Sequence, residues 1–270
     1  MVLSETGRAS VFPADCALVA EVLPSPNHGE RRGYARPDSL VLHYTGMPTA
    51  APALALLRDP AREVSCHYVI EEAGRILQLV PEGRRAWHAG VSCWRGERDM
   101  NSASIGVEIC NVGHDGGLPG FPDVQIAATI ALCRDVMSRH RMRPERVLAH
   151  SDIAPARKRD PGELFPWARL ALEGVGLWVE PSAPSEPLAA RGHEGPHVRG
   201  LQTLLALFGY ELETNGVYDA RMETVVAAFQ RRFRPERVDG VADASLVRSL
   251  RALLDLASGE GHDAGATVSS

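Results

Sequence analysis

The chain has 270 residues, of which 44% are hydrophobic, so it can bury a sizeable core and has room for one large and one small domain. Its formal net charge of -5 gives no electrostatic reason to expect nucleic acid or an anionic membrane surface as a partner. No apolar run reaches transmembrane length, and charges and prolines interrupt the first 23 residues where an export signal needs an unbroken apolar segment, which predicts a cytoplasmic globular protein.

The chain carries five cysteines, an odd number, at positions 16, 66, 93, 110 and 133. None of them belongs to a Cys-x-x-Cys pair, so the pattern indicates free thiols rather than disulfides or a thiolate zinc site. A nucleophilic thiol at Cys66, next to His67, is disfavoured because neighbouring residues of a strand point to opposite faces of a sheet.

Residues 39–44 form the first expected element, a nearly all-apolar strand with His43 near its C-terminal end. A helix is expected over residues 51–58. Apolar runs on both sides of a glycine-containing turn then predict a β-hairpin over residues 67–80. Together these elements indicate an α/β domain.

Two tryptophans and a histidine lie among glycines in residues 86–97. This composition suits a loop that grips a ligand, and it suits equally a loop that covers the edge of a sheet. The sequence leaves both interpretations open.

A strand over residues 104–110 places its carboxylate, Glu108, on the same face as Gly106 and Cys110. Carboxylates are rarely buried without a partner. Either an arginine neutralises Glu108, therefore, or the side chain faces a cavity where its charge has a task. From the strand alone, the ion pair is the commoner outcome.

A long amphipathic helix over residues 123–142 precedes a short buried strand, 147–149, which delivers His150 to the edge of the sheet. Prolines and a glycine in the following loop can fold Asp160 back toward His150. The structural alternative is a helix cap followed by a solvated basic loop, and it is the better interpretation unless a third ligand lies elsewhere.

After a further helix over residues 165–172, the composition turns rich in proline and serine and then helical. Three amphipathic stretches predict a small three-helix bundle: residues 198–208, 221–233 and 244–256. The predicted organisation is an α/β domain over residues 1–178, a linker over 179–192, a helical domain over 193–257 and a disordered tail over 258–270.

A third ligand is available at His43, near the end of its strand. With His150 and Asp160 it supplies two imidazole nitrogens and a carboxylate oxygen. That is the ligand set of a catalytic zinc, which takes three protein ligands and keeps its fourth position for water. Strand ends converge in a sheet, so the long separations along the chain are no obstacle, and we expect one zinc ion per chain.

Several motifs resemble the zinc-dependent N-acetylmuramoyl-L-alanine amidases of the peptidoglycan-recognition and phage-lysozyme amidase superfamily. They are Leu40-Val-Leu-His-Tyr-Thr45, Ser65-Cys-His-Tyr68, Ala86-Trp-His-Ala-Gly90, Ser104-Ile-Gly-Val-Glu108 and the run from His150 to Gly162. The C-terminal part resembles the peptidoglycan-binding helical domain of the bacterial branch in Phe208-Gly-Tyr210, Ala228-Phe-Gln-Arg-Arg-Phe-Arg234 and Asp239-Gly240. The resemblance covers nearly the whole chain.

The resemblance implies a central mixed β-sheet flanked by helices, followed by the three-helix bundle. It implies zinc on the three ligands named above, with Glu108 and Lys158 beside it as catalytic groups. The implied reaction is hydrolysis of the amide between the lactyl group of N-acetylmuramic acid, in ordinary or 1,6-anhydro form, and L-alanine of the stem peptide. One departure is visible: some phage relatives use a tyrosine near the metal where Cys66 stands, and here Glu108 takes that role.

Elementary chemistry supports the implied roles. Zinc lowers the pKa of its water from about 16 to about 7. Glu108 can accept the remaining proton and return it to the departing amine. The ammonium of Lys158 can hold the developing oxyanion, an interaction worth roughly 3–4 kcal/mol where water is excluded.

Candidates for binding the sugar and the stem-peptide carboxylates follow from side-chain chemistry alone. They are Trp87, His88, Asn111 and Arg157. Each also has a structural alternative. Trp87 could fill the core, and His88 could form hydrogen bonds within its loop. Asn111 could be a turn residue, and Arg157 could lie on the solvated surface.

Two other functions use the same fold. A non-catalytic muropeptide receptor typically lacks a zinc ligand, and a zinc peptidase would cut inside the stem peptide. The complete ligand set favours the amidase. Peptidoglycan fragments are the expected partners. The C-terminal domain points to the periplasm, whereas the missing export signal points to the cytoplasm and to recycled 1,6-anhydro-muropeptides, and we favour the cytoplasm.

Overall fold

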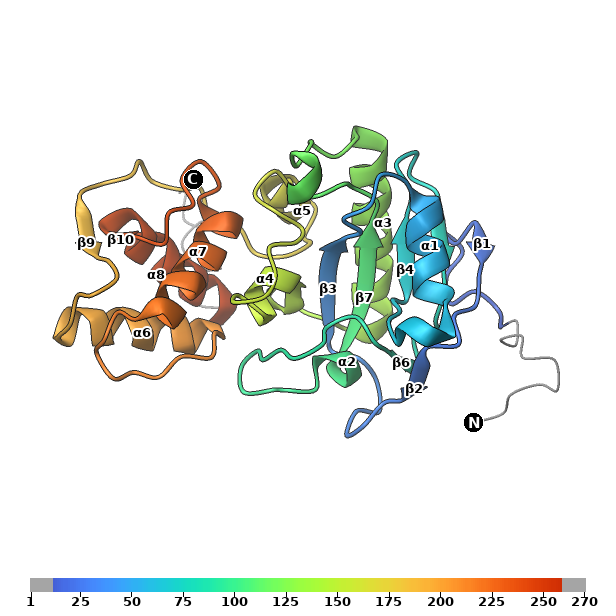
Figure 1. Cartoon of the computed structure of the whole chain (residues 1–270), viewed down its shortest axis with the longest axis horizontal. Coiled ribbons are helices and arrows are strands. Elements are labelled where there is room, and N and C mark those ends of the chain that lie inside the picture. The colour runs from blue at the N-terminus through green and yellow to red at the C-terminus, as the bar shows by residue number, and fades with distance from the viewer. Residues whose placement is uncertain (1–11, 259–270) are drawn as a thin grey trace, which may run out of the picture.

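The protein is described by a computed structural model, and residues 12–258 are the part of the chain that it describes. Figure 1 shows an α/β domain beside a smaller helical domain. The α/β domain comes first along the chain, which crosses to the helical domain after helix α5 (Trp167–Leu172).

A six-stranded mixed sheet forms the centre of the α/β domain. From one edge to the other, its strands are β1 (Glu21–Val22), β5 (Ile76–Gln78), β4 (Tyr68–Ile70), β7 (Ser104–Ile109), β3 (Ser39–Tyr44) and β8 (Val147–Ala149). Strands β4 and β5 pair antiparallel as the predicted hairpin, whereas β4, β7, β3 and β8 run parallel. The carboxyl ends of these four strands therefore meet at one edge of the sheet.

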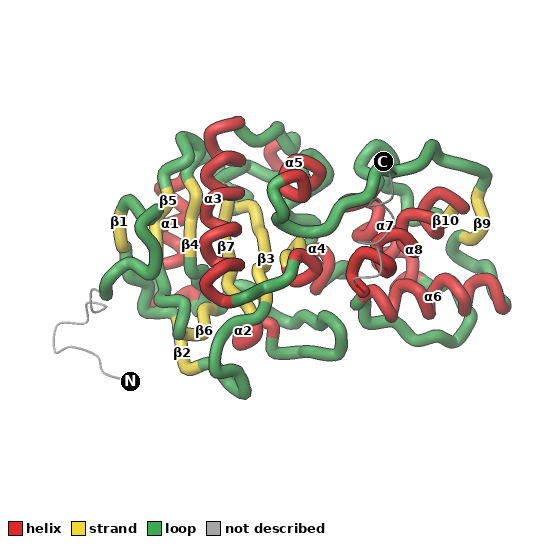
Figure 2. Tube along the Cα trace, turned by 180° about the vertical axis from the view of Figure 1, so that it is seen from behind, coloured by secondary structure: helices red, strands yellow, loops and turns green. Residues whose placement is uncertain are grey.

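Helices cover both faces of the sheet. Helix α3 (Asp123–His140) lies over one face and α1 (Ala50–Arg58) over the other (Figures 1 and 2). In β3, Leu40 and Leu42 join the core under α3, whereas Val41 belongs to a different cluster, because successive strand residues point to opposite faces. The predicted fold class, a mixed sheet flanked by helices, is confirmed.

The remaining elements of this domain are short. They are β2 (His28–Glu30), β6 (Arg84–Ala86), α2 (Met100–Ala103), α4 (His150–Ile153) and 3-10 turns at Pro60–Arg62, His114–Gly116 and Pro144–Arg146. Strands β2 and β6 pair with each other as a separate antiparallel sheet. Within residues 12–258, none of the helices combines the length and the apolar character that crossing a membrane requires.

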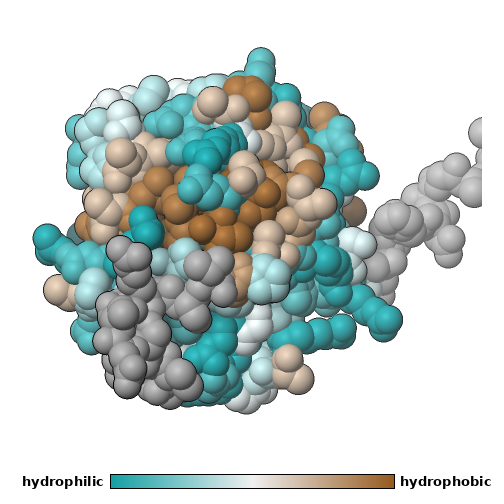
Figure 3. All heavy atoms as spheres, turned by 90° about the vertical axis from the view of Figure 1, so that its right-hand side faces the viewer, coloured by the Kyte–Doolittle hydropathy of each residue, from teal (hydrophilic) through white to brown (hydrophobic). Residues whose placement is uncertain are grey.

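Apolar side chains gather on the end of the molecule that faces away from the helical domain (Figure 3). Helix α1 lies at this end (Figure 1) and is apolar almost all the way round. Its Ala53 and Leu57 are buried, whereas Ala51 and Ala55 are exposed. The buried side of α1 forms one wall of the cavity described below.

The helical domain consists of the three predicted helices, α6 (Pro196–Phe208), α7 (Ala220–Phe233) and α8 (Ala244–Ser258). One residue from each illustrates their common core, since Leu205, Phe229 and Leu250 are all at most 1% exposed. The predicted bundle is therefore present.

Two details at the ends of this domain differ from the prediction. Pro187–Ala189, assigned to the linker, forms strand β9 and pairs with β10 (Ala242–Asp243). The linker was predicted from its prolines, yet proline is compatible with the first position of an edge strand. Helix α8 also includes Ser258, the first residue of the predicted tail, and the rest of that tail lies outside the described residues.

The two domains share one hydrophobic core. Trp94 is 2% exposed and meets the rings of Phe208 and Tyr210 edge-on, with centroid distances of 5.7 and 5.1 Å. Gly209 separates these two residues along the chain, and a Cβ atom on it would lie 2.5 Å from the indole of Trp94. Trp94 therefore packs within the protein, as the second interpretation of its loop proposed. It covers the junction between the two domains rather than the edge of a sheet.

A buried carboxylate, Glu82, ties the end of α3 to the sheet. Glu82 is 3% exposed and accepts hydrogen bonds of 2.6 Å from the Tyr68 hydroxyl and of 2.7 Å from both Arg139 and His140. Burial raises the pKa of the Glu82 carboxyl, but the hydrogen bonds from Arg139, His140 and Tyr68 outweigh it and lower that pKa to about 2.

We expect Glu82→Gln to lower the free energy of unfolding by about 3 kcal/mol at pH 7, because it leaves a partly buried arginine without its carboxylate. The ionised carboxylate stabilises the fold fully above the ordinary glutamate pKa of about 4.5, and that stabilisation is lost as the pH falls toward 2. Urea unfolding at a series of pH values should therefore show the two proteins converging in acid. Glu72→Gln, at an exposed turn position, is the control and should stay within about 0.5 kcal/mol of the parent.

Candidate active site

The parallel strands bring the predicted site residues to one edge of the sheet. His43 of β3 pairs with Glu108 of β7, and Leu42 pairs with Ala149, the last residue of β8. His150 follows directly and begins α4. Sites in sheets of this kind lie beyond the carboxyl ends of the parallel strands, and these residues stand there.

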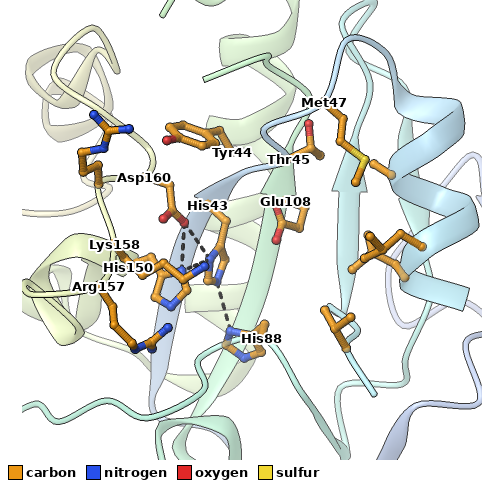
Figure 4. A pocket seen from close by; sticks show the side chains of 15 residues that line it. His43, Tyr44, Thr45, Met47, His88, Glu108, His150, Arg157, Lys158 and Asp160 are labelled. Carbon is orange, nitrogen blue, oxygen red and sulfur yellow. Dashed lines mark hydrogen bonds and ion pairs between the residues drawn. The ribbon is translucent and has the colours of Figure 1, made fainter. Parts of the chain in front are cut away.

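His43, His150 and Asp160 form a compact buried cluster (Figure 4). The Nδ1 atoms of the two histidines are 2.8 Å apart, and Oδ2 of Asp160 lies 3.0 Å from the first and 2.9 Å from the second. The exposed fractions of the three residues are 1, 2 and 6%. The fold thus brings together the three side chains predicted to hold the metal.

The far side of the His150 ring determines where its proton lies. Nε2 of His150 is 3.1 Å from the carbonyl oxygen of Ala89, which can only accept a hydrogen bond. The proton of neutral His150 therefore sits on Nε2, and Nδ1 presents a lone pair to Asp160.

A longer chain of hydrogen bonds determines which ring nitrogen of His43 carries the proton. The hydroxyl of Ser104 donates to the carbonyl of Met100, so its oxygen accepts from Nε2–H of His88 at 3.3 Å. Nδ1 of His88 is then an acceptor for Nε2–H of His43 at 3.1 Å. This leaves a lone pair on Nδ1 of His43 as well.

Three acceptor atoms therefore face one another without a donor, an arrangement that a cation relieves. Burial, followed by the charge of His150, lowers the pKa of His43 to about 4, so its imidazole is neutral, as metal binding requires. Burial disfavours the Asp160 carboxylate, but His150 and His43 outweigh it and lower the pKa of that group. The donor set fits a divalent ion, and these three side chains could hold one.

Glu108 faces the cavity beside this cluster (Figure 4). The expected arginine partner is absent: among residues 12–258, Oε2 of Glu108 is buried without a hydrogen-bond partner. The ion-pair interpretation is therefore wrong. Burial raises the pKa of Glu108 well above its usual value, Asp160 raises it further, and Lys158 opposes the rise. A carboxylate with a raised pKa is a stronger base than an ordinary glutamate side chain.

The cavity has a volume of about 390 Å³ and two unlike walls. The cluster, Glu108 and Lys158 make the polar wall. The opposite wall is apolar and consists of Met47, Ala53, Leu56, Leu57 and Val64. Sequence reasoning missed this apolar wall, and the only signal for it was the run of alanines and leucines in α1, which an ordinary core helix shares.

Lys158 is half-buried and lines the cavity. It is also the only lysine among the 29 lysine and arginine residues of the chain. Every other long cation is an arginine, which indicates that this position uses a compact ammonium group rather than a planar guanidinium. Composition alone could have singled out Lys158.

The four predicted substrate-binding residues separate in the structure. Neither Trp87 nor Asn111 lines the cavity. Asn111 is 7% exposed, and its amide donates to the carbonyl of Pro119 and accepts from the backbone N–H of Gly113, so the turn interpretation is right. The backbone N–H of Trp87 donates to the hydroxyl of Ser65, and the carbonyl of Trp87 accepts from the backbone N–H of Ser65. These two hydrogen bonds hold the loop around Trp87 in place.

His88 and Arg157 do line the cavity, but their polar groups have protein partners. Both ring nitrogens of His88 belong to the chain that orients His43. The guanidinium of Arg157 donates to the carbonyls of Ala89 and Val91 at 3.0 and 2.6 Å and so holds two loops together. Side-chain chemistry suggested ligand contacts because the sequence does not reveal these neighbours.

Comparison with known proteins agrees with this geometry. Residues 33–163 match the family model of N-acetylmuramoyl-L-alanine amidase, and residues 194–250 match that of a peptidoglycan binding domain. Over 235 residues the chain is 40% identical to the N-acetylmuramoyl-L-alanine amidase AmiD of Escherichia coli K12, covering 82% of this chain and 84% of that protein. The chain belongs to the N-acetylmuramoyl-L-alanine amidases. The predicted family and enzyme class are confirmed.

Two solved amidase structures are similar along most of their length. AmiD from E. coli, in complex with anhydro-N-acetylmuramic acid-L-Ala-D-gamma-Glu-L-Lys, is 37% identical with a TM-score of 0.70 and covers 85% of this chain and 98% of its own. AmpDh3 from Pseudomonas aeruginosa, in complex with an anhydromuramic pentapeptide, is 32% identical with a TM-score of 0.68 and covers 87% and 98%. Because each match covers at least 85% of this chain, it includes residues of both domains.

Gly106 of β7 makes room for the histidine that orients His43. A Cβ atom on Gly106 would lie 2.4 Å from Cγ of His88. We expect Gly106→Ala to destabilise this amidase by about 2 kcal/mol and to weaken metal binding about tenfold, because the ring of His88 must move. Thermal unfolding and metal titration measure the two effects. Gly29→Ala is the matched control, since Gly29 also lies in a strand but has no atom within 4 Å of the added methyl group.

Proposed function

We propose that the chain is a zinc-dependent amidase that cleaves the bond between the lactyl group of N-acetylmuramic acid and L-alanine, with zinc on His43, His150 and Asp160. The observation that carries the proposal is the convergence of three lone-pair atoms beside an unpaired carboxyl group in one cavity. Nitrogen and oxygen ligands of this kind suit zinc.

When bound, zinc polarises the amide carbonyl and makes water a better nucleophile at neutral pH. Glu108 supplies the proton transfers in this proposal. Its carboxylate takes a proton from the attacking water and, as the carbon–nitrogen bond breaks, returns it to the amine of L-alanine. The raised pKa of Glu108 suits both halves of this task, because the group can hold the proton between the two steps.

Lys158 stabilises the negative charge that develops on the carbonyl oxygen. Its ammonium lies on the cavity wall close enough to the cluster to influence the pKa of both His43 and Glu108. A positive charge fixed in a half-buried site acts more strongly than it would in water.

We propose muropeptides, including 1,6-anhydro forms, as the substrates. The support is the presence of anhydromuramic ligands in the complexes of AmiD and AmpDh3, together with an apolar wall able to accept the lactyl and alanyl methyl groups. The reaction would then serve cell-wall recycling or turnover.

The cytoplasm remains the predicted location. All five cysteines are buried free thiols, a state typical of proteins in a reducing compartment. Fractionation of cells that express the full-length protein tests this assignment against the periplasmic alternative.

Mass analysis of the products tests the proposed function. Incubation of the zinc-loaded protein with anhydro-N-acetylmuramyl peptide should release the free sugar acid and an intact stem peptide. A chelator should stop the release, and added zinc should restore it. Two peptide fragments would indicate a peptidase, and zinc binding without any product would indicate a receptor.

We expect Glu108→Gln to keep zinc affinity within about threefold of the parent while turnover falls at least a hundredfold, because general acid–base groups contribute 10²–10⁴ in rate. Isothermal titration with zinc and a product assay measure the two quantities. Turnover close to that of the parent would remove Glu108 from the mechanism.

We expect Lys158→Met to lower kcat roughly a hundredfold or more with little change in KM, because the charge acts on the transition state. Lys158→Arg keeps the charge but replaces a compact ammonium with a wider planar group, and we expect it to recover only part of the rate. Steady-state kinetics on a muropeptide would contradict the assigned role if Lys158→Met changed KM alone.

A further inference from the structure

The short helix α4 begins with His150, and two residues further along it carries Asp152, whose carboxylate is fully buried. Its Oδ2 accepts a hydrogen bond of 2.9 Å from the backbone N–H of Ala149 and so closes the turn at the start of α4. The same turn holds the other loop ligand, since the N–H of Ser151 donates to the backbone carbonyl of Asp160 at 3.0 Å. Two of the three cluster residues therefore depend on the shape of this turn.

The remaining partners of Asp152 come from the helical domain. The hydroxyl of Tyr210 donates to Oδ1 at 2.9 Å, and the guanidinium of Arg232 donates to Oδ2 at 2.5 Å. Helix α4 lies at the junction of the two domains (Figure 1), and its carboxylate is held by side chains of both.

Arg232 also grips the strand that leads into His150. Its Nη2 donates to the carbonyl of Val147 in β8 at 3.0 Å, and its guanidinium lies 4.0 Å from the ring centroid of Trp167. Arg232 is 3% exposed. Arg232 of the helical domain thus contacts both β8, which ends just before His150, and α4, which begins with His150.

Docking of the two domains does not by itself require this buried ion pair. The junction already contains the aromatic contact of Trp94 with Phe208 and Tyr210. Two further ion pairs cross it: Arg98 with Glu211 is on the surface, with Arg98 75% exposed, and Arg231 with Glu163 is partly buried with a separation of 3.5 Å. A buried ion pair is a weak source of stability after the cost of desolvation, but it fixes geometry closely. Here it is placed on the turn that bears the metal ligands.

We propose that the helical domain is a structural part of the metal centre: Arg232 and Tyr210 are positioning residues that hold His150 and Asp160 through Asp152. The inference rests on the proposed zinc site and extends it. In this arrangement the domain does more than hold peptidoglycan near the catalytic domain, because its side chains set the geometry of two ligands. Residues that orient metal ligands from outside commonly change metal affinity 10–100-fold when they are replaced.

Zinc titration of the full-length chain and of three variants tests the proposal. Arg232→Met removes the guanidinium and keeps an apolar side chain. Tyr210→Phe removes only a hydroxyl and keeps the aromatic packing. Arg234→Met is the matched control: Arg234 is 4% exposed and pairs with Asp243 at 2.6 Å, but both belong to the helical domain. Circular dichroism at the assay temperature selects conditions in which every variant is folded.

We expect Arg232→Met to weaken zinc binding 10–100-fold and to lower kcat on a small muropeptide while KM stays within about twofold. Tyr210→Phe should weaken zinc binding less, about fivefold, because only part of the loss of one hydrogen bond to a charged group is passed on to the metal ligands. Arg234→Met should lower the unfolding temperature yet leave zinc affinity within about twofold of the parent.

If the parent protein binds zinc and is active, the proposed function stands, and either of two results would then overturn the inference alone. One is parental zinc affinity in both Arg232→Met and Tyr210→Phe. The other is a loss of zinc affinity in Arg234→Met equal to that in Arg232→Met, which would assign the effect to stability. A parent chain that binds no zinc would overturn the proposed function together with the inference.

Discussion

The structure depends on the meeting of three lone pairs, on His43, His150 and Asp160, at the edge where the parallel strands end. Such a meeting is unfavourable without a cation, and the fold holds it in place from outside. The carbonyl of Ala89 fixes the tautomer of one histidine, and the chain through His88 fixes that of the other. The arrangement of the cluster therefore begins with a backbone carbonyl and a buried histidine outside the cluster itself.

Residues of the helical domain also hold the cluster in place from outside. The helical domain joins the core of the α/β domain through Trp94, and it reaches the ligand turn through Arg232. A domain whose family is named for peptidoglycan binding is thus built into the support of the catalytic cluster.

The cavity combines two environments that a hydrolase of this kind needs. The polar wall holds the cluster, Glu108 and Lys158, whereas helix α1 and its neighbours present hydrocarbon. Burial and the nearby charge of Asp160 raise the pKa of the Glu108 carboxyl group, and its buried Oε2 has no hydrogen-bond partner among residues 12–258. In the proposed mechanism, an ion pair at Glu108 would remove the group that transfers the proton.

The sequence by itself determined the elements and the chemistry. Alternation and apolar runs located the strands that carry His43 and Glu108, the motifs identified the amidase family, and the three amphipathic stretches gave the bundle. Residues such as Trp87 and Asn111 were harder, because an aromatic ring or an amide has the same chemistry in a cavity and in a turn. Only the tertiary structure decided that Asn111 closes a turn and that His88 orients His43. It also decided that Arg232 supports the ligand turn. His88 and Arg232 act on residues 45 and 85 positions away along the chain, and no local pattern records which side chains meet over such separations.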